Sequence, residues 1–230
     1  MQNGLTNSST PNENMLQRDY FMRMTEMLAA VLAKVLLNKE KENYEDAEKE
    51  IEAAAKTIVG LDLKIISVLN IEELVSLLKT SDTYAGRTLI TAELLKEYGD
   101  IIGEKGDAKK SITTYIKALC LYIESILSKE LPVPETYYPR VDFLIKHVAQ
   151  FDKSRELKIR IIEYYEISGQ YSKAEDFLFE LIDNKDESIY DKAVGFYKRL
   201  QGKPDVDLIK GNLSREEVEE SLEEILSLKK

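Results

Sequence analysis

Apolar residues recur every three or four positions along most of the chain, which is the spacing of residues on one face of an α-helix. The pattern is clearest between Ala92 and Leu121, where two amphipathic segments flank a Gly106-Asp107 turn. Such a pattern on both sides of one turn predicts a pair of antiparallel helices. The residues on the two inner faces are Leu95, Tyr98, Gly99 and Ile102, then Ser111, Ile112, Tyr115, Ala118 and Leu119.

The segment from Met15 to Asn38 is also helical by its spacing, but its apolar stripe is wider than one face. Leu32 and Leu37 widen it, and Met22, Met24 and Met27 add adaptable apolar side chains. Either this helix is sandwiched between other helices, which is the commoner cause of a wide stripe, or it forms a subunit contact. The sequence therefore predicts a monomer or a weak homodimer.

Local signals mark the ends of several further helices. A helix over 44–59 is followed by Gly60, which suits a C-terminal cap. Asn70 with Glu73, and Ser214 with Glu217, have the spacing of a capping box, so helices are expected over 71–79 and 214–228. The last of these helices has one apolar face, with Val218, Leu222, Ile225 and Leu226 expected to point inward and six glutamates outward.

Composition divides the chain into segments. Residues 1–14 are nearly all polar and are expected to form a disordered leader. Pro132, Pro134 and Pro139 interrupt the helical pattern, so residues 132–139 are interpreted as a connection between an N-terminal half, 15–131, and a C-terminal half, 140–230. Within the second half, 202–212 is interpreted as an irregular loop and 214–228 as a capping helix.

A second hairpin, 155–184, has its turn at Gly169. The spacing of large, small and turn residues in 92–121 and 155–184 resembles that of the tetratricopeptide-repeat family, with Leu95 where the family usually has Trp. Gly169 and Gly202 are 33 residues apart, close to the family period, and Gly195 stands at the packing-glycine position of a third, incomplete repeat. The resemblance implies an all-α fold, a right-handed α-solenoid of antiparallel helix hairpins. Separately, the opening QRDYFMRMTE resembles the start of a small bacterial family of helical proteins without an assigned function.

Charge and hydropathy narrow the classes of partner. Charged residues are 32% of the chain and the formal net charge is −10, which disfavours binding to nucleic acid and to anionic membranes. No apolar run is long enough to span a membrane, and the first residues lack the pattern of a signal peptide. A cytoplasmic location is expected, and the single cysteine, Cys120, agrees with a reducing compartment.

The sequence contains no motif that indicates catalysis. His147 is the only histidine and has no second imidazole or thiolate for a zinc site, and Cys120 has no nearby group that would activate its thiol. Glycine-rich phosphate-binding motifs and the G-x-S-x-G motif are missing from the sequence. We therefore predict no catalytic residues, no metal and no cofactor. The alternative is a small enzyme, or an enzyme regulator, with an unrecognised carboxylate site.

The resemblance to tetratricopeptide repeats implies a peptide groove lined by the first helix of each hairpin. Six of the eight residues at those positions are acidic, so the expected partner is a protein or peptide rich in Lys or Arg. A competing interpretation is an ordinary solvated face, because the whole protein is acidic. The groove positions are Glu93, Lys96, Asp100, Glu104, Glu156, Ile159, Glu163 and Glu166.

Overall fold

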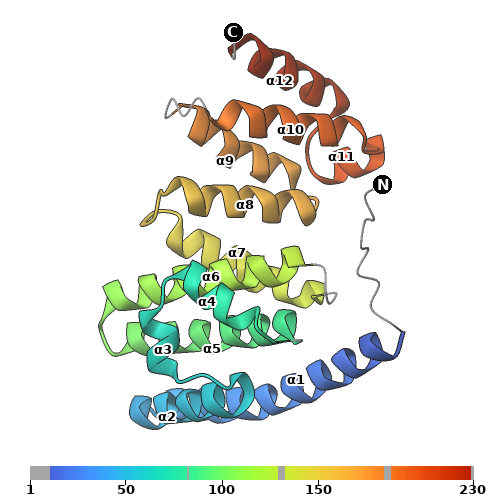
Figure 1. Cartoon of the computed structure of the whole chain (residues 1–230). Coiled ribbons are helices and arrows are strands. Elements are labelled where there is room, and N and C mark those ends of the chain that lie inside the picture. The colour runs from blue at the N-terminus through green and yellow to red at the C-terminus, as the bar shows by residue number, and fades with distance from the viewer. Residues whose placement is uncertain (1–10, 82, 129–132, 184–187, 229–230) are drawn as a thin grey trace. The chain divides into compact units, whose positions relative to one another are not determined.

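The computed structural model describes residues 11–81, 83–128, 133–183 and 188–228, and these residues form helices joined by turns, with no β-strand among them (Figure 1). The all-α prediction is confirmed. The chain divides into two compact units, Met1–Val148 and Ala149–Lys230. The division falls after Val148 rather than at the proline-rich connection, because helix α7 (Tyr138–Val148) packs on the preceding helices of the first unit.

Two further boundaries differ from the sequence-based ones. Helix α1 spans Pro11–Glu40, so residues 11–14 are helical rather than part of a disordered leader, whereas residues 1–10 lie outside the described residues. Pro139 is in the first turn of α7, where the missing N–H of proline has no helical partner to lose. The described part of the connection is therefore shorter than 132–139.

The first unit is built from packed helices in chain order. Helix α1 packs on α2 and α5, α5 forms a hairpin with α6, and α7 packs on α6. The elements after α1 are α2 (Tyr44–Ala54), a π-helical turn (Ala55–Val59), α3 (Leu63–Val68), α4 (Ile71–Leu78), α5 (Tyr84–Glu104), α6 (Ala108–Ser128) and a 3-10 turn (Glu135–Tyr137) before α7.

The two helices of the α5–α6 hairpin approach each other closely where Gly99 lies against Tyr115. Gly106 adopts a φ of 91°, which glycine accommodates at a helix end without the strain of a side chain. Gly99 faces the ring of Tyr115, and a Cβ atom at Gly99 would lie 2.6 Å from the Cδ1 and Cε1 atoms of that ring. The Ser111 hydroxyl donates a hydrogen bond of 2.7 Å to the Gly99 carbonyl. The α5 and α6 helices form the hairpin predicted over 92–121, and both extend beyond that repeat, α5 at its start and α6 at its end.

Helix α1 buries only one of its apolar faces. Met24, Leu28 and Val35 are buried against the rest of the unit, whereas Met22 and Leu36 are half exposed. The methionines of the predicted stripe are thus divided between the core and the surface. The wide stripe is only partly explained by packing within the unit.

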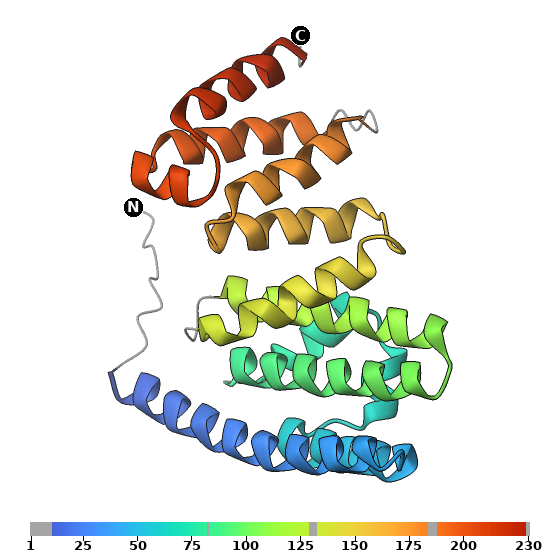
Figure 2. The same ribbon diagram turned by 180° about the vertical axis from the view of Figure 1, so that it is seen from behind.

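The second unit contains α8 (Arg155–Ile167), α9 (Tyr171–Asp183), α10 (Ile189–Gln201), α11 (Asp205–Lys210) and α12 (Arg215–Leu228), seen from behind in Figure 2. Helices α8 and α9 form a hairpin whose turn residue, Gly169, has a φ of 73°, and α10 packs on both α9 and α12. The prediction of an irregular loop over 202–212 is wrong in part, because helix α11 forms within this segment. Pro204 at its N-cap has a φ of −61° and supplies an extended residue before the helix.

The capping box that opens α12 is confirmed. The Ser214 amide donates to Glu217 Oε2 at 2.6 Å, and the Glu217 amide donates to Ser214 Oγ at 3.2 Å. Val218, Leu222 and Ile225 are buried as predicted, but Leu226 is exposed, since it lies at the edge of the apolar face. Glu175 of α9 accepts hydrogen bonds from Tyr197 and Ser221, which connects α9 to α10 and α12.

Candidate functional site

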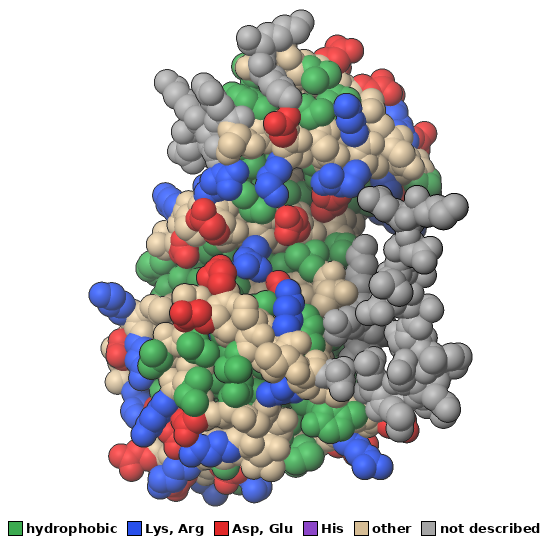
Figure 3. Space-filling model, in the orientation of Figure 1, with side chains coloured by type: hydrophobic (Ala, Val, Ile, Leu, Met, Phe, Trp, Pro, Cys, Tyr) green, Lys and Arg blue, Asp and Glu red, His purple; other side chains and the backbone are tan. Residues whose placement is uncertain are grey.

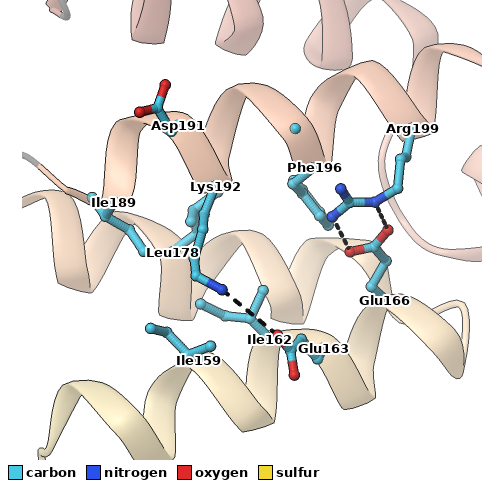
Figure 4. Close-up of a pocket in the computed structure, with 11 residues that line it drawn as sticks. Ile159, Ile162, Glu163, Glu166, Leu178, Ile189, Asp191, Lys192, Phe196 and Arg199 are labelled. Carbon is cyan, nitrogen blue, oxygen red and sulfur yellow. Dashed lines mark hydrogen bonds and ion pairs between the residues drawn. The ribbon is translucent and has the colours of Figure 1, made fainter. Parts of the chain in front are cut away.

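A groove in the second unit lies between α8 and α10, the first helices of two successive helix pairs (Figure 4). Its volume is about 630 Å³, which is within the usual range for sites that bind a small molecule or a few side chains of a peptide. Helix α8 supplies one wall and α10 the other, and the floor is formed by side chains of α8, α9 and α10. The lining residues are Ile159, Ile162, Glu163, Glu166, Leu178, Ile189, Asp191, Lys192, Gly195, Phe196 and Arg199.

The floor of the groove is apolar. Ile162, Leu178 and Phe196 are almost fully buried, and Ile159 is partly exposed at the α8 side. These residues belong to the core faces of their helices, so the apolar surface that the floor exposes is small and lies mainly at Ile159. Insertion of a side chain there would remove its surface and that of the floor from water, and this removal is favourable when the side chain is apolar.

Two ion pairs cross from α8 to α10. Arg199 donates to both carboxylate oxygens of Glu166, with Nε–Oε1 at 2.6 Å and Nη2–Oε2 at 2.8 Å. This hydrogen bonding to Glu166, and then the charges of Glu166 and Glu163, raise the pKa of the Arg199 guanidinium against the opposing effect of burial. The second pair is looser, with Lys192 Nζ 3.8 Å from Glu163 Oε1 and both side chains about half exposed.

Gly195 opens the α10 wall between these two basic residues. A Cβ atom at this position would meet only the end of the Arg199 side chain, Nη1 at 3.3 Å. The repeat spacing predicted a packing glycine at this position, but Gly195 lines the groove, and no atom of another described helix lies within 4 Å of the place of its Cβ atom. Glycine inside a helix costs about 0.5–1 kcal/mol relative to alanine, and here it keeps the groove free of side-chain atoms.

Three of the four predicted groove residues on α8 line this groove. They are Ile159, Glu163 and Glu166, whereas Glu156 is exposed nearer the start of α8 and is not among the lining residues. The acidic character predicted for the groove is largely balanced by Lys192 and Arg199. Figure 3 shows basic and acidic side chains lying next to one another on the drawn face of the protein. The basic residues of α10 could not be assigned to this groove from the repeat pattern, because the third repeat is incomplete.

The four predicted positions on α5 do not line this groove: Glu93 is buried, Lys96 and Asp100 are partly buried, and Glu104 is exposed. Glu93 is only 2% exposed, and its Oε1 lies 3.0 Å from Nε of Arg140 on α7. Burial raises the pKa of the Glu93 carboxyl, and the neighbouring Tyr122 and Arg140 oppose that shift. Glu93 therefore does not line an open groove, and its interpretation as a groove residue is corrected.

Lys96, Asp100 and Glu104 belong to an ion-pair network with Lys39 of α1. Asp100 accepts hydrogen bonds from Lys39 at 2.9 Å, from Lys96 at 3.0 Å and from the Tyr115 hydroxyl at 2.7 Å. Glu104 lies 3.6 Å from Lys39. Burial opposes ionisation of Asp100, but Lys96, Tyr115 and Lys39 together hold its pKa below the ordinary 3.8. The network connects α1, α5 and α6, so these charges contribute to packing within the first unit.

This network predicts an acid-dependent loss of stability. A carboxyl with a lowered folded-state pKa stabilises the fold above its ordinary pKa and loses that contribution as the pH falls through the folded value. We expect Asp100→Asn to lower the free energy of unfolding by about 1–2 kcal/mol at neutral pH. The difference in free energy of unfolding between the variant and the original protein should become smaller below pH 3.8, the ordinary pKa of an aspartate. Urea denaturation across this pH range measures it.

Asp46→Asn is the matched control for that experiment. Asp46 also accepts from a lysine, Lys49 at 2.8 Å, but both side chains are exposed and lie on one helix. Its replacement should change stability very little. Equal effects of the two substitutions would contradict a structural role for the Asp100 network.

A family model matches residues 15–230, and the chain belongs to that family, described as Family of unknown function (DUF6483). The searches of curated proteins and of solved structures each found no match. None of the described helices has the length and apolar character needed to cross a membrane. Within the described ranges, no three His, Cys, Asp or Glu residues are grouped so that they could hold a metal ion.

Proposed function

We propose that this protein is a protein-interaction module that holds a segment of a partner in the α8–α10 groove. The observation that carries the proposal is the combination of an open apolar floor with a charged rim supplied by two helices. Recognition sites for peptides commonly combine apolar anchors with a few polar groups that fix orientation. The proposal requires no catalytic step and no cofactor.

We also propose that the helices stack as a right-handed α-solenoid of the tetratricopeptide kind. The α5–α6 pair of the first unit and the α8–α9 pair of the second unit each turn at a glycine with positive φ. Within the second unit the groove lies between α8 and α10, the first helices of its two helix pairs. In such arrays the first helices line the surface that binds peptides. This architecture supports a binding function and does not by itself identify the partner.

The partner segment should carry at least one large apolar side chain and a basic group. The apolar side chain would cover the floor beside Ile159, and the basic group would lie near Glu163, whose 3.8 Å pair with Lys192 is the looser of the two. Because most of the floor is already buried, the additional apolar area is small and the affinity should be modest. Since Lys192 and Arg199 balance much of the acidic charge, we expect only a moderate decrease of affinity with salt.

Filling the groove from the α10 side should weaken binding strongly. Gly195→Leu places a branched side chain at the open wall, where only the flexible end of Arg199 is close. It should leave the fold intact, since leucine is a better helix former than glycine. Peptides selected from a random library against the original protein should lose affinity for the variant by about tenfold or more, measured by isothermal titration calorimetry.

Gln201→Leu provides the control, because Gln201 is an exposed residue of α10 that does not line the groove. This variant should bind the selected peptides with unchanged affinity. If Gly195→Leu binds them as tightly as Gln201→Leu does, the groove is not the binding surface and the proposed function is wrong.

A further inference from the structure

The outer face of α1 carries an apolar stripe that the first unit leaves exposed. Met22 and Leu36 are 52% and 51% exposed, and Ala29 and Ala33 between them are also exposed. The opposite face of α1 carries Met24, Leu28 and Val35, which are buried in the unit. The exposed stripe is thus a second apolar face and not an extension of the core.

The stripe has the spacing of a helix–helix seam. Met22, Ala29 and Leu36 are each seven residues apart, and a seven-residue apolar repeat keeps one face of a helix toward a partner helix. The small side chains of Ala29 and Ala33 allow two backbones to approach closely at the middle of the stripe. α1 forms one side of the first unit in Figures 1 and 2.

The opposite charges at the two ends of the stripe complement those of a second, antiparallel copy of the same helix. Arg18 and Glu40 are exposed, lie at opposite ends of the stripe, and are each eleven residues from Ala29. In an antiparallel pair centred on Ala29, Met22 of one helix faces Leu36 of the other, and Arg18 faces Glu40. A two-fold interface requires such self-complementarity, because every contact occurs twice.

We propose that two copies of this protein associate through α1 in an antiparallel, two-fold pair centred on Ala29. The apolar stripes cover each other, and the two Arg18–Glu40 pairs fix the register. The proposed interface consists of residues of α1 in the first unit and shares no residue with the α8–α10 groove of the second unit.

The mass of the full-length chain tests the interface. Sedimentation velocity from about 5 to about 200 µM should show a concentration-dependent dimer. Leu36→Glu should shift the chain to monomer throughout that range, because it buries two charges at the apolar seam. Val68→Glu, at a more exposed apolar residue of α3, should leave the dimer unchanged. A monomer at all concentrations, or equal effects of the two variants, would overturn the proposal.

Charge exchange tests the register. Arg18→Glu and Glu40→Arg should each raise the dimer dissociation constant by about three- to tenfold, since each creates two like-charge contacts. The double variant restores opposite charges and should return the constant close to its original value. Additive weakening in the double variant contradicts the antiparallel register.

Cysteine cross-linking tests the centre of the pair. Ala29→Cys places the two new thiols opposite each other, and mild oxidation should give a covalent dimer. Ala33→Cys is the control, because in this register the two thiols are offset by eight residues, about 12 Å along the helix, and disulfides require Cα atoms within about 7 Å. Equal cross-linking at both positions indicates a parallel pair and overturns the proposal.

Discussion

Replacing Gly211 with alanine is expected to destabilise the second unit by about 1–3 kcal/mol, because the new methyl group has no space. A Cβ atom at Gly211 would lie 2.7 Å from the Gly169 carbonyl oxygen and would overlap the Tyr171 ring. The Gly169 atom belongs to the backbone and cannot rotate away. The Gly211 carbonyl also accepts a hydrogen bond of 3.0 Å from the Ser172 amide, so a shift at Gly211 would disturb the start of α9.

Gly202→Ala is the matched control for this substitution. Gly202 and Gly211 are both C-terminal caps with a φ of −79°, so alanine changes the backbone preference equally at the two positions. At Gly202 the nearest atom to a Cβ is the Arg199 carbonyl oxygen, at an ordinary distance of 3.5 Å. Urea denaturation with hydrogen exchange of α9 should show a loss of protection only for Gly211→Ala. Similar stability of the two variants would contradict the close approach of α11 to the α8–α9 turn.

Gly99→Ala should destabilise the first unit by a comparable amount, about 1–3 kcal/mol. Its Cβ atom would overlap the Tyr115 ring, and moving that ring would break the 2.7 Å hydrogen bond from the Tyr115 hydroxyl to Asp100. The substitution therefore affects both the helix packing and the ion-pair network. Thermal unfolding monitored by circular dichroism measures the effect.

Gly195→Ala is the control for Gly99→Ala, since both glycines are inside helices and lie seven residues before a turn or cap glycine. At Gly195 the methyl group enters the open groove, so the higher helix propensity of alanine should stabilise the protein by up to about 1 kcal/mol. The two substitutions should thus have effects of opposite sign. A stabilising Gly99→Ala would show that the α5–α6 contact is looser than its geometry indicates.

The sequence predicted the helices well where local chemistry determines them. The capping residues Asn70 and Ser214 and the turn residues Gly106 and Gly169 act within a few positions of themselves, and each has the predicted role. The structure divides the chain after Val148 and not at the prolines. A proline indicates only that a helix is interrupted or begins near it, and not which neighbouring helices pack together. Pro139 interrupts a helix only if it lies inside one, and here it lies in a first turn.

The candidate groove was predicted only in part. Ile159, Glu163 and Glu166 could be assigned from the repeat spacing of α8, and they do line the groove. Glu93 lies at a corresponding repeat position on α5, but it is buried beside Arg140 of α7. The contact between α5 and α7 cannot be predicted from the local sequence pattern. Arg199 and Lys192 were missed because ion pairs between helices depend on tertiary distances. The pairing of Lys192 and Arg199 with the glutamates of α8 is seen only when the positions of both helices are known.

The most direct test of the proposed groove is an NMR titration of the full-length chain with isoleucine methyl groups labelled. Ile159, Ile162 and Ile189 line the groove, whereas Ile51 and Ile66 are core residues of the first unit. A library-selected peptide should shift the methyl signals of the three groove isoleucines and leave those of Ile51 and Ile66 in place. Saturable shifts confined to isoleucines outside the groove, with Ile159, Ile162 and Ile189 unchanged, would contradict the assignment of the α8–α10 groove as the partner-binding surface.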